Sequence, residues 1–299
     1  MPLPTKIVDI HQHANWCGRD TAGLVADLRE HQVAYAWLLT WCLGPTEEAS
    51  RHLSYLNPIY YHSTPHPGMP LADIVEAKAR YPRDFIVGYC PHPTWPDAPK
   101  LLANAHATHG ARVCGEWKYR MPFDDPRCLE LFRVAGELKM PVILHLDVPY
   151  LRDAKGVPVY QPEWYGGTVE NLQRALVACP ATTFIGHAPG FWREISGDAA
   201  TEPKQYPDGP ITPGGKLFRL FAEHPNLWAD LSAESGRTAL ARDPAHAVDF
   251  ITRHADRLVF GRDFYGSKLH TLLQTLPLAP VVVEKIYWQN AERLVPAPL

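Results

Sequence analysis

Eight short apolar runs alternate with amphipathic segments along the chain. The runs are short and rich in β-branched residues, which is typical of buried strands. The segments between them carry apolar side chains at the spacing of one helix face. The predicted strands are residues 7–10, 33–40, 85–89, 112–118, 141–146, 182–186, 226–231 and 257–261, and the predicted helices are residues 20–31, 71–80, 99–109, 126–139, 216–224, 245–254 and 281–294, with one more that carries Val169, Leu172, Ala175 and Leu176.

This alternation favours a parallel sheet covered by helices. Eight strand–helix units in 299 residues fit a (β/α)8 TIM barrel of the α/β class. No break in composition divides the chain, so we expect a single domain over residues 1–299. An open doubly wound sheet is the alternative, but no glycine-rich phosphate loop follows the first predicted strand.

Composition excludes several classes of partner. The net charge of −3 gives no reason to expect nucleic acid or an anionic membrane surface as a partner. No stretch approaches the roughly 20 consecutive apolar residues of a membrane span. No basic, apolar leader precedes the first predicted strand. The six cysteines are scattered without a C-x-x-C pair, so we expect reduced thiols in a cytoplasmic protein.

The first predicted strand leads directly into His11-Gln-His13. Side chains two residues apart on a strand point to the same side, so both imidazoles are expected to enter one space. Two neutral imidazoles that converge in this way suit a first-row metal ion such as zinc. The simpler alternative is a pair of solvated histidines in a loop.

Other predicted strands also end in ionisable residues. Barrel active sites lie at the C-terminal ends of the strands, and a shared metal ion would partner side chains that are costly to bury alone. Each residue also has a structural alternative: a core histidine, a turn, a helix cap or an ion pair. Together they make a metal site the better interpretation. These residues are Glu116 and Lys118 on strand four, His145 on strand five, His187 after strand six and Asp263 after strand eight.

Together these motifs resemble the amidohydrolase superfamily, from Val8-Asp-Ile-His-Gln-His13 to Trp288-Gln-Asn-Ala-Glu-Arg-Leu294. The similarity is to the amidohydrolase-related branch, which includes aminocarboxymuconate-semialdehyde decarboxylase, resorcylate decarboxylases and several lactonases. The resemblance implies a metal-dependent barrel with His11, His13 and His145 as metal ligands. It also implies that Asp263 binds metal and shuttles a proton, and that His187 polarises the substrate or holds a second metal.

Strand four leaves the ligand set open, because members of the superfamily place either a carboxylated lysine or a glutamate there, or no ligand. Glu116 and Lys118 have the same strand parity, so both can face inward. Glu116 is already an anionic oxygen ligand and is the favoured choice, which leaves Lys118 to pair with a charge or with a substrate carboxylate. We expect a divalent ion, zinc before manganese or iron, with one or two ions per chain.

The expected reaction is hydrolysis of a lactone, ester or amide of a small molecule. A divalent cation lowers the pKa of bound water, Asp263 can take and return the proton, and His187 can donate to the developing oxyanion. The alternative keeps these ligands and catalyses decarboxylation or hydration of a carboxylated aromatic or sugar-derived substrate. A third hypothesis, a binding protein without catalysis, is disfavoured because Asp263 is present.

Substrate contacts are expected from Lys118 and from residues in or near the long loops 44–70, 147–166 and 188–212. Aromatic side chains at a barrel opening suit ring-shaped substrates, although they can also pack loops onto the barrel. Arginines there can hold a carboxylate or remain solvated. The resemblance allows a homodimer. The predicted substrate contacts are Lys118, Arg152, Trp192 and His92.

Overall fold

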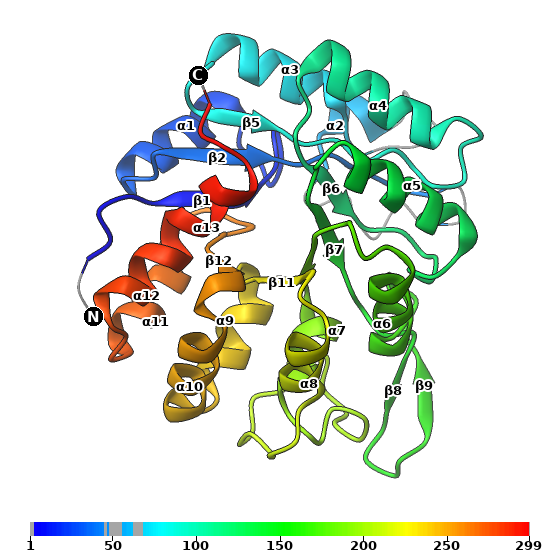
Figure 1. The fold of residues 1–299 in the computed structure, drawn as a ribbon, viewed down its shortest axis with the longest axis vertical. Coiled ribbons are helices and arrows are strands. Elements are labelled where there is room, and N and C mark those ends of the chain that lie inside the picture. Colours follow the sequence, from blue (N-terminus) through cyan, green and yellow to red (C-terminus); the bar gives the residue numbers. More distant parts are fainter. Residues whose placement is uncertain (1–2, 45–46, 48–55, 62–67, 299) are drawn as a thin grey trace.

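The computed structural model describes residues 3–44, 47, 56–61 and 68–298. Its principal strands are parallel to their neighbours and form two sheets, of order β1-β2-β5 and β12-β11-β10-β7-β6 (Figure 1). These strands are β1 (Val8–Gln12), β2 (Tyr35–Leu38), β5 (Phe85–Val87), β6 (Cys114–Trp117), β7 (Val142–His145), β10 (Phe184–His187), β11 (Leu227–Asp230) and β12 (Leu258–Val259).

Backbone hydrogen bonds join the two sheets at both edges. Beside β5 and β6, the Tyr89 N–H donates to the Val113 carbonyl at 2.9 Å. At the other edge, the Ile10 N–H of β1 donates to the carbonyl of Phe260, directly after β12, at 3.1 Å. The strands therefore follow one another in chain order around one axis, and their C-terminal ends surround one opening.

Helices lie outside the strands (Figure 1). The helical segments are α1 (Thr21–Glu30), α2 (Pro58–Tyr61), α3 (Leu71–Arg80), α4 (Ala98–His109), α5 (Pro126–Glu137), α6 (Val169–Ala178), α7 (Pro189–Trp192), α8 (Lys216–Glu223), α9 (Ala233–Ala241), α10 (Pro244–His254), α11 (Lys268–Thr275), α12 (Pro280–Glu284) and α13 (Asn290–Leu294), with the 3-10 turns η2 (Arg193–Ile195) and η3 (Ala255–Arg257) and the π-helical turn η4 (Lys285–Gln289). The Asp20 side chain caps α1 by accepting from the Gly23 N–H at 2.8 Å, as side-chain oxygens commonly do at helix starts.

The interior is a packed apolar floor beneath the opening. A layer of large β-branched and aromatic side chains fills it, from seven of the eight strands and from Val113 directly before β6, as in other parallel barrels. Among its members are Val8, Ile10, Trp37, Ile86, Val113, Ile143, Ile185, Trp228 and Val259. A second and larger apolar cluster packs the strands against the helices.

The connections differ most from the sequence-based expectation. The predicted loop 147–166 contains an antiparallel hairpin of β8 (Tyr150–Arg152) and β9 (Pro158–Tyr160). Most of the predicted loop 44–70 lies outside the described residues, and its described end, β4 (Gly68–Met69), pairs with β3 (Trp41–Cys42).

Helix α9 was not predicted, because Ser235-Gly236 in its middle lowers helix propensity. A Cβ at Gly236 would lie 2.3 Å from the Leu231 carbonyl oxygen, so glycine lets this helix approach the end of β11. None of the helices in the described part of the chain is long and apolar enough to cross a membrane.

The apolar floor should carry much of the stability. Val259→Ala, at a fully buried position of β12, should lower the free energy of unfolding by about 2 kcal/mol because it removes buried methyl groups and leaves a cavity. The same substitution at Val177 of α6, which is 65% exposed, should change it by less than about 0.5 kcal/mol. Urea unfolding measures both, and equal effects would contradict this placement of the core.

Candidate metal centre and active site

Strand β1 contains an irregularity that brings its histidines to the opening. Its register with β2 pairs Asp9 with Ala36 and Gln12 with Leu38, so three steps on β1 match two steps on β2. Ile10 packs in the apolar interior. In a regular strand His11 would face the opposite way from Ile10, and a bulge of this kind can re-aim it.

Strand β6 contains the same kind of irregularity. Cys114 pairs with Val142 and Trp117 with Leu144, which leaves one extra residue on β6. Val113 packs in the interior, yet Glu116 also reaches the central group of histidines. In a regular strand, side chains alternate between the two faces, and Glu116 would face away from the interior position of Val113. The bulge thus turns the Glu116 carboxylate toward the histidines.

Four strand ends converge on a small group of nitrogen and oxygen atoms. Asp263 Oδ1 lies 3.5 Å from both His11 Nε2 and His13 Nε2. Its Oδ2 lies 3.4 Å from His187 Nε2. Glu116 Oε2 lies 3.8 Å from His11 Nε2 and 3.6 Å from His13 Nε2, while its Oε1 lies 4.0 Å from His187 Nε2.

The donor atoms fit a divalent cation. His11 Nε2 is buried and has no hydrogen-bond partner among the described residues. Such an atom is costly unless another group partners it. Two sets of three residues place their ligand atoms within 4.8 Å of one another: His11, His13 and Asp263, and His11, Glu116 and His187. Imidazole nitrogens with carboxylate oxygens suit zinc and other first-row ions.

Asp230, at the end of β11, fixes two of these histidines from behind. Its Oδ2 lies 2.7 Å from His11 Nδ1 and 3.2 Å from His187 Nδ1. It also accepts from the Ser232 hydroxyl at 2.6 Å, and that hydroxyl lies 3.0 Å from His187 Nδ1. With both Nδ1 atoms engaged, both Nε2 atoms face the centre, which is the usual arrangement behind metal-ligating histidines.

The charges at the centre are mutually dependent. Burial opposes ionisation of Asp230, but hydrogen bonds from His11 and His187 outweigh it and lower its pKa to about 2. Burial and the neighbouring His11 disfavour the charged form of His187, yet Asp230 and Asp263 raise its pKa to about 9. Without a cation, protons on the histidines balance the carboxylates, so metal binding is expected to release protons.

His145 lies beside this group, with its ring nitrogens turned to two carboxylates. Its Nδ1 is 2.5 Å from Glu116 Oε1, and its Nε2 is 2.9 Å from Asp147 Oδ2. Neither set of three ligand atoms includes it. The role of His145 as a metal ligand therefore stays a prediction. To bind a metal ion, the ring has to give up its contact with one of these two carboxylates.

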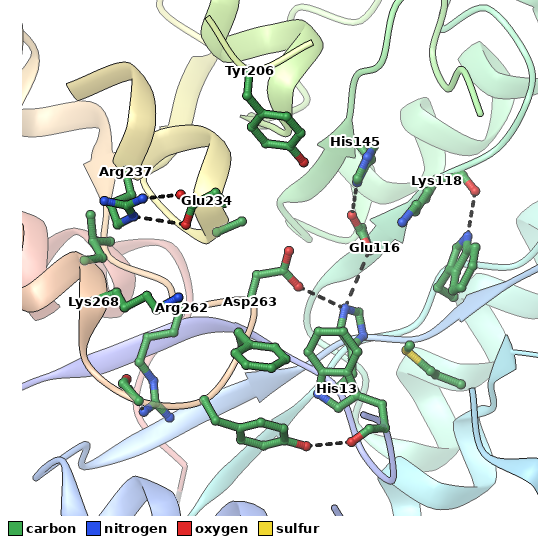
Figure 2. Close-up of a pocket in the computed structure, with 18 residues that line it drawn as sticks. His13, Glu116, Lys118, His145, Tyr206, Glu234, Arg237, Arg262, Asp263 and Lys268 are labelled. Atoms are coloured by element: carbon green, nitrogen blue, oxygen red, sulfur yellow. Dashed lines mark hydrogen bonds and ion pairs between the residues drawn. The ribbon is translucent and has the colours of Figure 1, made fainter. Parts of the chain in front are cut away.

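A cavity of about 420 Å³ opens above the centre (Figure 2). Its wall combines aromatic and charged side chains. The lining includes Trp16, Trp41, Tyr206, Phe264 and Tyr265, with Lys118, Arg237 and Lys268 as cations, and it reaches His13, Glu116, His145 and Asp263. A concave aromatic and charged space of this size suits a small polar molecule.

Of the predicted substrate contacts, Lys118 lines this cavity, and its ammonium lies over the rings of Trp41 and Tyr165. The cavity lining does not include Arg152, Trp192 or His92. Arg152 lies on the exposed hairpin and donates to the Gly156 carbonyl at 2.7 Å.

Trp192 is buried and its indole N–H donates to the Asp230 carbonyl at 2.9 Å. His92 is also buried, with its Nδ1 2.8 Å from the Thr94 hydroxyl and its ring packed on Tyr119. Local packing and hydrogen bonds explain the positions of both side chains, since aromatic side chains near a barrel opening often pack the loops onto the barrel.

The sequence analysis missed Asp230 and also Arg262. The buried Arg262 guanidinium donates to Asp9 Oδ2 and to Asp27 Oδ2, each at 2.7 Å, and so ties β1 and α1 to the segment that carries Asp263. The signal for Asp230 was present, because it is an acidic residue at the end of an apolar run, as Glu116 is.

Three strand ends turn through the left-handed backbone region. Ala188 follows His187 with φ 80°, Ala233 follows Ser232 with φ 61°, and Asp263 itself has φ 49°. Non-glycine residues in this region cost of order 1–3 kcal/mol and concentrate at functional sites. The turns let the chain leave each strand sharply while His187, Ser232 and Asp263 stay at the centre.

Comparison with known proteins gives a consistent family and fold. A family model described as amidohydrolase matches residues 71–297. No curated protein matches the chain significantly. Among solved structures, an uncharacterised TIM-barrel protein from Bordetella bronchiseptica is 18% identical, covering 97% of this chain and 98% of that chain with a TM-score of 0.62.

Two further structures have names that describe reactions. A probable 2-pyrone-4,6-dicarboxylic acid hydrolase from Acinetobacter baumannii, with citric acid bound, is 13% identical over 97% of this chain and 99% of that chain, with a TM-score of 0.58. A dihydroxybenzoic acid decarboxylase from Polaromonas sp. JS666, with bound manganese and the inhibitor 2-nitroresorcinol, is 15% identical over 97% and 96%, with a TM-score of 0.56. At these identities the likeness establishes the fold, and the predicted (β/α)8 barrel is confirmed.

The role of Asp230 can be tested by Asp230→Asn, which keeps the side-chain size but removes the charge. Metal affinity should fall about 10- to 100-fold because His11 and His187 lose the anion that orients them. Competition with a chromophoric chelator measures this. Asp249→Asn on the exposed part of α10 is the matched control. Equal affinity in both variants would contradict the positioning role of Asp230.

Proposed function

The chain belongs to the amidohydrolase family, and from this membership we propose that it hydrolyses a lactone, ester or amide of a small anionic molecule. It is a metal-dependent enzyme of the amidohydrolase superfamily, and members of this family bind divalent metals. The hydrolytic reaction, the metal and the substrate class are our proposals, and each is supported by a feature of the centre or of the cavity above it.

The position of Asp263 is the observation that carries the proposal. Its carboxylate contacts the Nε2 atoms of His11, His13 and His187, and it also lines the cavity. Its side chain is 18% exposed, whereas that of His11 is fully buried. Asp263 is therefore placed to take a proton from a water molecule at the cavity floor and to return it to a leaving group.

The proposed ligands are His11, His13, Glu116 and Asp263, with His145 and His187 beside them. A bound divalent cation would lower the pKa of water toward neutrality and polarise a carbonyl. Glu116 presents Oε2 to His11 and His13 and Oε1 to His145 and His187, so this residue would help to hold one ion or two. We propose zinc, with manganese, present in the Polaromonas decarboxylase, as the alternative.

His187 is proposed to polarise the substrate carbonyl. Asp230 and Ser232 hold its Nδ1, which leaves Nε2 directed to the centre beside Asp263. When the ring is protonated, Nε2–H is a donor fixed in this way, and it would stabilise negative charge on the carbonyl oxygen without having to reorganise.

Lys118 supports an anionic substrate. Its ammonium lies 4.5 Å from the centroid of the Trp41 ring, at the edge of the cavity where Glu116 and His145 also lie (Figure 2). A carboxylate beside this ammonium would stay within reach of the centre, and the aromatic wall would enclose the rest of the molecule. We therefore propose Lys118 as a substrate contact.

Decarboxylation is the second candidate. The fold shared with the Polaromonas decarboxylase and the Lys118 ammonium at the cavity favour it, because a carboxylated substrate could bind in the same place. Hydrolysis is preferred because Asp263 combines contact with the histidines and access to the cavity, as water activation requires.

We further propose that the protein is a single-domain cytoplasmic protein whose cysteines are free. We propose that it can form a homodimer and that it has no nucleic-acid or membrane partner.

The reaction can be tested with panels of lactones, aryl esters and carboxylated phenols. The purified protein should contain one or two metal ions, lose ester and lactone turnover with a chelator, and regain it with zinc. In ¹⁸O-water the product acid should take up one label. His13→Ala should lose the metal, while His109→Ala on the exposed end of α4 should retain it. Release of CO2 from the phenols without ester turnover would replace hydrolysis by decarboxylation.

A further inference from the structure

Tyr206 projects into the catalytic cavity from the segment between η2 and α8. Figure 2 shows its ring entering from the wall opposite His13, with the hydroxyl directed toward the space between His145 and Asp263. It is 43% exposed, and it also lines a small crevice together with Trp192 and Arg242. The hydroxyl faces the space available to the substrate.

Buried Arg193 holds the segment on the N-terminal side of Tyr206. Its Nη2 donates to the carbonyls of Ala199 and Glu202, at 2.7 and 2.6 Å. The Arg193 residue is only 4% exposed. Hydrogen bonds from a buried guanidinium to two backbone carbonyls fix the path of this segment more firmly than surface contacts would.

Arg242 holds the segment on the other side. Its Nε donates to the Gly209 carbonyl at 2.7 Å, and its Nη2 donates to the Pro210 carbonyl at 2.9 Å. The Arg242 side chain is 1% exposed. Tyr206 therefore lies between two arginine-held points, so placing its hydroxyl against a substrate costs little further ordering.

The Tyr206 hydroxyl is available as a donor. Within residues 3–44, 47, 56–61 and 68–298 it makes no hydrogen bond, although it faces a cavity rich in polar atoms. Partial desolvation at the cavity wall raises the pKa of Tyr206 to about 12, with Asp147 and Asp263 adding to the effect, so the proton is retained at neutral pH. A fixed donor without a protein acceptor is suited to an oxygen of the substrate.

We propose that Tyr206 is a catalytic residue that donates a hydrogen bond to the leaving oxygen of the substrate, a role that rests on the proposed hydrolysis. His187 Nε2 lies 3.4 Å from Asp263 Oδ2, and Asp263 lines the cavity, so a carbonyl bound beside Asp263 would have its leaving group extending toward Tyr206. Water oxygen bonds to the carbonyl carbon, and the bond from that carbon to the leaving oxygen breaks. Its electron pair stays on the leaving oxygen, which takes the proton that Asp263 removed from water. Tyr206 keeps its own proton throughout.

The test compares Tyr206→Phe with the wild type on 4-nitrophenyl acetate and phenyl acetate. Phenoxide is the poorer leaving group and carries more charge on its oxygen, so its ester should lose about 10- to 100-fold in kcat with little change in KM. The nitrophenyl ester should lose much less. Tyr150→Phe, on the exposed hairpin, is the matched control and should match the wild type on both esters.

Equal losses of kcat on both esters would show that Tyr206 has only a structural role and would overturn the proposal. An unchanged kcat in Tyr206→Phe would also overturn it. Thermal unfolding of the variant checks that it remains folded. A wild-type enzyme that hydrolyses none of a panel of anionic and neutral lactones, esters and amides would overturn the proposed function and this role together. An active wild type with an unaffected variant would overturn the role of Tyr206 alone.

Discussion

The active centre depends on one buried anion, Asp230. Its carboxylate is inaccessible to solvent and accepts hydrogen bonds from histidines on two different strands, His11 on β1 and His187 on β10. An unpaired carboxylate at this depth would be costly, so the contacts fix both imidazole rings as well as the charge. Because Asp230 and Ser232 engage the Nδ1 atoms, both Nε2 atoms are directed to the same point. The metal site is therefore organised from β11, a strand that supplies none of the proposed ligands.

Two bulges complete this arrangement. Regular strands would alternate their side chains between the interior and the helix layer, and Ile10 and Val113 occupy the interior positions. The extra residues in β1 and β6 turn His11 and Glu116 toward the opening as well. The apolar floor can thus be packed to the strand ends without excluding the ligands. Arg262, paired with Asp9 and Asp27, anchors the following segment, so Asp263 meets the histidines from the far side.

The sequence predicted the repeating frame well, because each strand and most helices have strong local periodicity. It also predicted several of the strand ends that approach the centre, since ionisable residues in apolar runs need partners, but it missed Asp230 at the end of β11. It did not predict the contacts of Arg152, Trp192 and His92, because loop side chains are placed by tertiary packing rather than by spacing. Arg152 lies on a hairpin with an exposed edge, and Trp192 is drawn to the backbone of β11.

The bulges in β1 and β6 could not be predicted from the sequence, because a bulge depends on how a strand pairs with its neighbour. His11 and His13 share a parity in any regular strand, so their convergence was predictable, but their relation to Ile10 required the pairing register with β2. The role of Asp230 could have been predicted by the reasoning used for Glu116, since both are acidic residues at the end of apolar runs. Helix α9 was not predicted, because Ser235-Gly236 lowers its helix propensity and its place depends on the close approach allowed by Gly236.

The most direct measurement is a crystal structure of the zinc-loaded protein with anomalous scattering recorded on both sides of the zinc edge. We predict an anomalous peak bounded by His11 Nε2, His13 Nε2 and Asp263, with any second peak on the far side of Glu116. The same map would show whether His145 leaves Asp147 to bind metal. Peaks confined to surface histidines, with the group around His11 unchanged, would contradict a metal centre at these strand ends.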